Sequence, residues 1–228
     1  MSPPGRRAAA AFLGPACLLA SCTPGGAVEP TGQRPQPSPA TSFVVPSPIL
    51  APRPFIEKDL PAIVLGRRDA PAGTEFAPQY SVDQNIDQFA SNGEELTALR
   101  QDRFVVGQTA LFVPQGQLDH GVLPAEHGSV FVQAIAGLFE TPEGADSTLL
   151  RYVANLRAFQ LTDEVRIDAE GLGASSEGLR GVADGDRITV FAWRTANLVL
   201  VVTGSGTMAA TDVRALADLM QHRADLAR

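Results

Sequence analysis

Two histidines and two carboxylates stand close together in one short stretch, as Asp119-His120 and Glu126-His127. Imidazole and carboxylate groups bind transition metals and exchange protons, so this stretch is the first place to look for chemistry. A helical metal motif would put both histidines on one face one turn apart, but this stretch shows no helix pattern to align them. We therefore expect solvated loop residues with no metal and no cofactor, and keep His120 and His127 as weak ligand-binding candidates.

Two glycine-containing stretches match phosphate-binding or nucleophile loops only in part. The stretch from Gly171 to Ser176 follows one expected strand and precedes another, so no helix N-terminus is there to receive a phosphate. Gly204-Ser205-Gly206 separates a strand from a helix, and there we expect a loop with an N-cap at Thr207. Trp193 is expected in the core or on a sheet face, and is kept as a third weak ligand-binding candidate. No set of catalytic residues emerges.

The N-terminus has the organisation of an export signal. Arg6-Arg7 precedes an apolar run from Ala8 to Ala20, too short to cross a bilayer core of about 30 Å as a helix. The run ends in Leu19-Ala20-Ser21-Cys22, which resembles the lipobox of bacterial lipoproteins. That resemblance implies a signal peptide over residues 1–21, a diacylglycerol on the Cys22 sulfur, and Cys22 as the first mature residue. The alternatives are cleavage near Ala20 by the ordinary signal peptidase, or a buried N-terminal helix.

Net charge limits the possible binding partners, and cysteine content limits the possible disulfides and metal sites. The chain has 18 Lys+Arg and 25 Asp+Glu, and loss of Arg6 and Arg7 with the leader leaves 16 against 25, a net charge of -9. A domain this acidic is repelled by nucleic acids and by anionic membranes, so we expect no nucleic-acid partner and expect acyl chains to hold the protein at the membrane. Cys17 and Cys22 are the two cysteines, so the mature domain has neither a disulfide nor a thiolate metal site.

The composition changes once along the mature chain. Nine of the 18 prolines fall between Thr23 and Pro54, where their missing amide hydrogens and restricted backbone disfavour helices and interior strands. We predict a disordered, proline-rich linker over residues 22–54 and a single globular domain over residues 55–228. The linker would hold the domain away from the membrane, or it would be an unselected connection.

Apolar periodicity predicts the order of elements in the domain. We expect helices over 57–65, 81–90, 94–101, 141–158 and 209–227, the second beginning at a capping box of Ser81 and Gln84. We expect strands over 104–113, 129–139, 159–167, 177–183, 187–194 and 198–203, with a tight hairpin turn at Asp184-Gly185. A long loop, residues 114–128, joins the first two strands.

Clustered strands with short turns predict an α+β fold, a two-layer domain in which helices cover one face of an antiparallel sheet and a helix ends the chain. In outline the order resembles the extracytoplasmic domains of bacterial lipoproteins and, more distantly, sensor-type and PsbP-like domains. The first hypothesis is a lipid-anchored extracytoplasmic domain that binds or interacts with a partner. The sequence does not identify this partner, which is a protein or a small molecule. We expect the 114–128 loop to lie at the rim of the binding groove. The alternatives are a lipophile carrier with an apolar cavity, and a cell-envelope enzyme that would need His120 or His127 beside an acid and a nucleophile.

Overall fold

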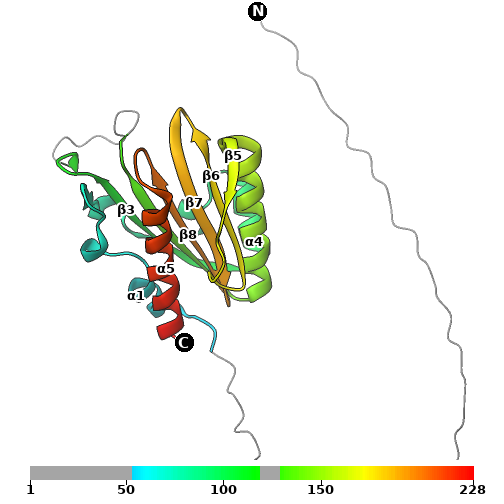
Figure 1. Cartoon of the computed structure of the whole chain (residues 1–228). Coiled ribbons are helices and arrows are strands. Elements are labelled where there is room, and N and C mark those ends of the chain that lie inside the picture. The colour runs from blue at the N-terminus through cyan, green and yellow to red at the C-terminus, as the bar shows by residue number, and fades with distance from the viewer. Residues whose placement is uncertain (1–52, 119–128) are drawn as a thin grey trace, which may run out of the picture. The chain divides into compact units, whose positions relative to one another are not determined.

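The computed structural model describes residues 53–118 and 129–228, which form an eight-stranded sheet with helices packed against it (Figure 1). Every pair of neighbouring strands is antiparallel, in the order β1-β3-β4-β8-β7-β6-β5, and β2 also pairs with β3. The strands are β1 (Thr74–Phe76), β2 (Asp83–Gln84), β3 (Phe104–Pro114), β4 (Val132–Phe139), β5 (Thr162–Ile167), β6 (Ser175–Ala183), β7 (Asp186–Thr195) and β8 (Leu198–Ser205). The predicted α+β class with an antiparallel sheet is confirmed.

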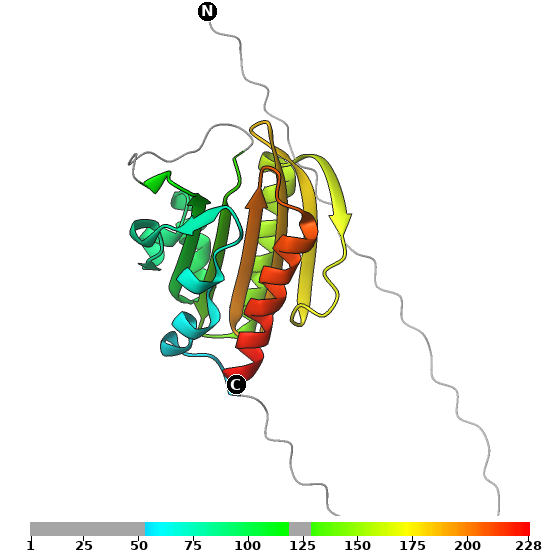
Figure 2. The ribbon, with the colours of Figure 1, turned by 60° about the vertical axis from the view of Figure 1, so that its left-hand side comes forward.

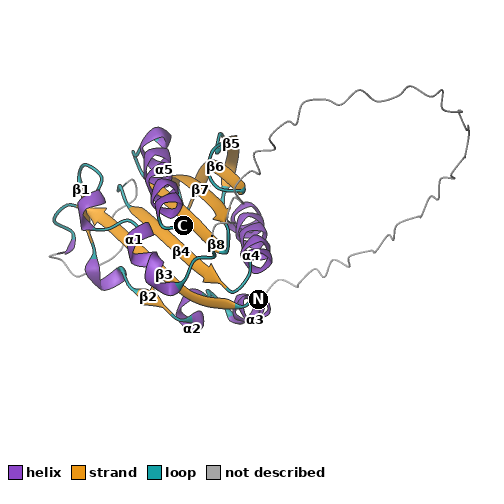
Figure 3. Cartoon of the chain, turned by 90° about the horizontal axis from the view of Figure 1, so that it is seen from below, coloured by secondary structure: helices purple, strands orange, loops and turns teal. Residues whose placement is uncertain are grey.

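Helices lie on both faces of this sheet. They are η1 (Glu57–Asp59), α1 (Leu60–Ile63), η2 (Arg67–Asp69), η3 (Pro78–Tyr80), α2 (Ile86–Phe89), α3 (Gly93–Gln101), α4 (Pro142–Asn155), η5 (Leu156–Gln160) and α5 (Ala210–Leu226). The predicted C-terminal helix is therefore present as α5, which crosses one face together with α1, while α4 lies behind the strands on the other (Figure 2). Seen from below, α2 and α3 lie on the same side as α4 (Figure 3).

The expectation that helices cover a single face is wrong, and the strands explain why. Along β7, Phe191 and Trp193 belong to the core under α5, whereas Val190 and Ala192 belong to the core under α4. Strand β8 is buried on both sides from Leu198 to Val202. A strand without a polar side must be covered on both faces, and this continuous apolar run signals two helical layers.

The predicted capping box at Ser81 and Gln84 is also wrong. Gln84 lies in β2, and α2 begins four residues later than predicted, with Asn85 as its N-cap and Gln88 completing the capping box. The Ser81 hydroxyl instead donates to the Ala77 carbonyl and accepts from the Leu111 amide. Asparagine is at least as good an N-cap as serine, so the better-placed cap determines the start.

The predicted start of a helix at residue 141 and the predicted hairpin turn are confirmed. Thr141 caps α4 by accepting from the Gly144 amide at 3.2 Å, with Pro142 at the first helical position. Asp184 and Gly185 have φ values of 50° and 88°, as a tight hairpin turn with two positive φ angles requires. No helix in the described ranges is both long enough and apolar enough to span a membrane.

Candidate functional site

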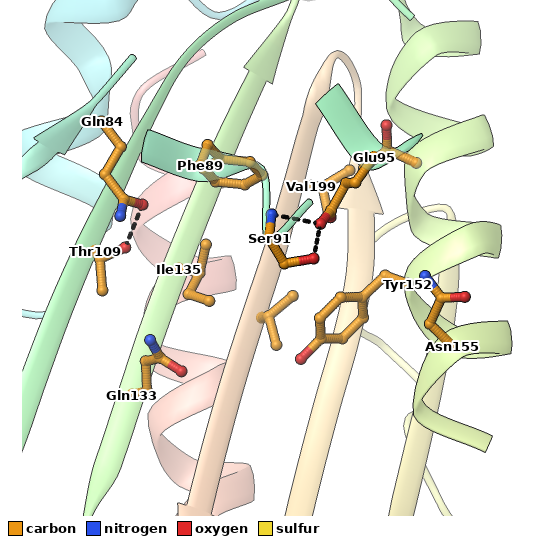
Figure 4. Close-up of a pocket in the computed structure, with 12 residues that line it drawn as sticks. Gln84, Phe89, Ser91, Glu95, Thr109, Gln133, Ile135, Tyr152, Asn155 and Val199 are labelled. Carbon is orange, nitrogen blue, oxygen red and sulfur yellow. Dashed lines mark hydrogen bonds between the residues drawn. The ribbon is translucent and has the colours of Figure 1, made fainter. Parts of the chain in front are cut away.

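A groove on the α4 face of the sheet is the candidate site (Figure 4). Its volume is about 240 Å³, and it lies between the α2–α3 segment and α4, over strands β3, β4 and β8. Its lining residues are Gln84, Phe89, Ser91, Glu95, Thr109, Gln133, Ile135, Thr148, Tyr152, Asn155, Val199 and Val201. Eight of these twelve side chains carry a polar group, so the groove is a hydrogen-bonding site above an apolar floor.

The position of the first wall depends on how helix α3 begins. Asn92 begins α3 by accepting hydrogen bonds from the amides of Glu94 and Glu95, at 3.0 and 2.9 Å. This places Glu95 in the first turn, where a carboxylate is stabilised by the helix dipole. Its Oε2 atom accepts a hydrogen bond of 2.7 Å from the Ser91 amide and another from the Ser91 hydroxyl. The Glu95 carboxylate is thus held in a defined position at the groove (Figure 4).

The floor is a row of side chains from three paired strands. Thr109 of β3 is in register with Ile135 of β4, which is in register with Val201 of β8. Because alternate residues of a strand point to the same face, Gln133 and Val199 lie on this side as well. Thr109 Oγ1 donates to Gln84 Oε1 at 2.8 Å, which fixes the Gln84 side chain at the end of the groove.

The second wall is a polar stripe on α4. Thr148, Tyr152 and Asn155 follow one another at helical spacing. The pKa of the Tyr152 phenol is raised to about 12, chiefly by burial and to a smaller extent by the negative charge of Glu95, against the lowering effect of a hydrogen bond from Thr203. The phenol is therefore protonated throughout the physiological range and can donate a hydrogen bond to a bound molecule.

The groove brings together one carboxylate, one protonated phenol and several amide and hydroxyl groups. Such a set of converging polar groups over an apolar surface is the usual construction of a small-molecule site. The volume lies just below the range of about 300–1,000 Å³ that is typical for drug-sized ligands, which favours a smaller molecule. Within residues 53–118 and 129–228, no group of three histidine, cysteine or acidic side chains could hold a metal ion.

Among the described residues, those that the sequence singled out do not line this groove. Cys22, His120 and His127 lie outside the described residues. Trp193 has no exposed surface and its Nε1 donates to Gln221 Oε1 at 2.8 Å, so it lies in the core, as expected, and does not line the groove. The described part of the predicted rim loop, residues 114–118, contributes no lining residue.

The two glycine stretches have structural roles. Gly173 has a φ of 55°, and a Cβ atom there would lie 2.1 Å from the Arg194 carbonyl oxygen, so this turn needs glycine for close packing. Gly204 and Ser205 belong to β8, and α5 is preceded by Ala209 instead of the predicted cap at Thr207.

Sequence reasoning missed the groove residues, although α4 carried a signal. Leu149, Val153 and Leu156 recur at helical spacing in the sequence, and all three are buried. Thr148, Tyr152 and Asn155 each precede one of these by one residue and so form a polar stripe beside the apolar one. A polar stripe that borders a buried face is a candidate wall for a groove.

Comparisons with known proteins give a structural likeness but no match in sequence. No protein-family model and no curated protein matches this chain in sequence. Among solved structures, the chain is similar to the extracellular domain of PknH from Mycobacterium tuberculosis, with a TM-score of 0.47 and 11% sequence identity, over 76% of this chain and 98% of that one. A likeness this distant does not transfer a site or an activity.

Proposed function

We propose that this chain is a lipid-anchored extracytoplasmic lipoprotein whose folded domain binds a small polar molecule in the groove between α2–α3 and α4. The leader that ends at Cys22 supports the anchor and the location, and the groove supports binding. The observation that carries the binding role is the convergence of eight polar side chains on one cavity of about 240 Å³.

The anchor is tested by changing the sulfur that would carry it. Cys22→Ala is expected to abolish labelling by a radioactive fatty acid and to release the protein from membranes, because one thioether would hold the acyl chains. Cys17→Ala is the matched control, since it removes the other cysteine from the same leader and should keep both label and membrane association. Label that persists in Cys22→Ala, or that is lost from Cys17→Ala alone, contradicts the assignment.

The binding role is tested by filling the groove. Asn155 is an exposed residue at the groove wall and Ala154 is its exposed neighbour outside the lining, so tryptophan at either position should leave the fold intact. Native mass spectrometry of protein purified from the producing cell should show a bound small molecule on the wild type and on Ala154→Trp, and none on Asn155→Trp. Equal occupancy of the two variants, or an empty wild-type protein, would count against this site.

The groove favours this function over the alternative of a lipophile carrier. A carrier needs an enclosed apolar cavity, whereas eight of the twelve side chains that line this groove carry a polar group, and these groups would lose water without gaining partners if a hydrocarbon chain entered. The enzyme alternative depends on His120 or His127, which lie outside the described residues, and it stays a prediction from sequence.

A further inference from the structure

Glu95 is the charged residue among those that line the groove. Both of its hydrogen bonds, from the amide and the hydroxyl of Ser91, reach the same oxygen, Oε2. Across the described part of the chain, Oε1 accepts no hydrogen bond and no basic side chain forms an ion pair with this carboxylate. The Oε1 atom of Glu95 can therefore accept a hydrogen bond from a ligand, and the negative charge of the carboxylate is available to it.

The basic residues on the two walls are engaged elsewhere. Arg100, on α3, lies 3.8 Å from the carboxylate of Asp87. Arg151, on α4, donates to Asp102 and to Thr148 Oγ1. Since neither arginine pairs with Glu95, the groove keeps a net negative charge that attracts a cation.

The other lining groups suit a cation that also has an organic part. The rings of Phe89 and Tyr152 lie on opposite sides of the floor (Figure 4), and aromatic faces attract ammonium groups. Gln133 offers an amide oxygen that can accept a hydrogen bond from a polar ligand. The charge of Glu95 also raises the pKa of Tyr152, which indicates that its field extends across the groove to the opposite wall.

We propose that the ligand of the groove is a small organic ammonium ion, with its nitrogen at Glu95 Oε1 and its organic part between Phe89 and Tyr152. This inference rests on the proposed function, because it requires the groove to be the ligand site. It adds the charge and the chemical class of the ligand, and it makes Glu95 the residue that selects cations over neutral molecules of the same shape.

The test compares charged and uncharged probes of equal shape. The charged probes are ethanolamine and choline. Their controls are ethylene glycol, and the alcohol in which a tert-butyl group replaces the trimethylammonium group of choline. Binding to the full chain is measured by NMR titration, and the amide signals that shift are assigned to residues. The ammonium group of ethanolamine can donate a hydrogen bond to Glu95 Oε1, and a hydrogen bond to a charged group contributes about 1.5–3 kcal/mol, so Glu95→Gln should weaken ethanolamine binding by at least about tenfold. Choline has no N–H group, so its binding should weaken only through the loss of the negative charge.

Glu94→Gln is the matched control variant, because Glu94 is an exposed acid in the same helical turn and does not line the groove. The inference holds if an ammonium probe shifts groove signals, its uncharged control does not, and Glu95→Gln but not Glu94→Gln loses the effect. Uncharged probes that shift the same signals as strongly would overturn the choice of a cation and leave the groove as a binding site. If no ammonium probe shifts groove signals, the inference fails. The proposed function is then tested separately, by whether the wild-type protein carries a bound small molecule that the Asn155→Trp protein lacks.

Discussion

Asn197 ties the start of the folded domain to the sheet, and its replacement by alanine should be costly. The side chain is 3% exposed and sits in the turn between β7 and β8. Its Oδ1 accepts from the Phe55 amide at 2.8 Å, and its Nδ2 donates to the carbonyl oxygens of Phe55 and Phe139 at 3.1 and 2.7 Å. Asn197→Ala would leave three buried backbone groups without these partners.

The size of the effect follows from those three hydrogen bonds. At about 1 kcal/mol each, their loss lowers the free energy of unfolding by about 3 kcal/mol. In a domain of this size, 1 kcal/mol corresponds to roughly 2–4 °C in Tm, so the melting temperature should fall by about 6–12 °C. Trp193 is the chain's single tryptophan and is fully buried, so its fluorescence reports unfolding in urea without a label.

Asn155→Ala is the control for this measurement. Asn155 is exposed and its side chain makes no hydrogen bond with the described residues, so its removal should change the free energy of unfolding by less than about 0.5 kcal/mol. A loss of less than about 1 kcal/mol for Asn197→Ala, at an unchanged dependence on urea, would refute the reasoning that these three bonds hold the first segment in place.

Two further predictions concern packing and pH. Gly144→Ala should lower the free energy of unfolding in urea by about 1–3 kcal/mol, because the added Cβ atom would lie 2.0 Å from the Asp102 carbonyl oxygen. This loss is expected even though alanine favours helices more than glycine does. Gly93→Ala is the control and should not destabilise the protein, because the space around Gly93 is open. Burial alone would raise the pKa of Asp69, but hydrogen bonds from Arg223 and Gly66 outweigh it and lower that pKa. The resulting stability is present above the unfolded pKa of about 3.9 and is lost as pH falls through the lower folded value. Asp69→Asn should therefore flatten the loss of stability in acid-unfolding curves, and an unchanged slope would contradict this.

Local signals in the sequence predicted where helices and turns occur better than they predicted how many faces of the sheet the helices cover. The start of the helix at residue 141 and the turn at Asp184-Gly185 depend on residues within a few positions of one another, and both are confirmed. The number of covered faces depends on which side of each strand is apolar across the whole sheet. In β8 the unbroken run from Leu198 to Val202 carried this information, but a short apolar run does not by itself distinguish one face from two.

The groove was harder to predict because its residues come from distant segments. Gln84, Gln133 and Tyr152 are close in space only because β2 pairs with β3, β3 with β4, and α4 packs over the strands. Each is an ordinary polar residue within its own element. Histidines, cysteines and glycine loops attract attention in a sequence because of their chemistry, whereas a binding site made of amides, hydroxyls and one carboxylate has no such signature.

The two faces of the sheet differ in how completely the helices cover them. Under α5, residues such as Phe191, Trp193 and Met220 form a closed core, and Asn197 fastens the first segment at its edge. On the opposite face, α3 has nine residues against fourteen in α4, and the preceding α2 has four, so these elements leave strands β3, β4 and β8 partly uncovered. The groove is therefore a consequence of short helices beside a long one. Because Glu95 and Asn155 lie on its walls and outside both cores, their substitution should change binding while stability is kept, and Asn197→Ala should do the reverse.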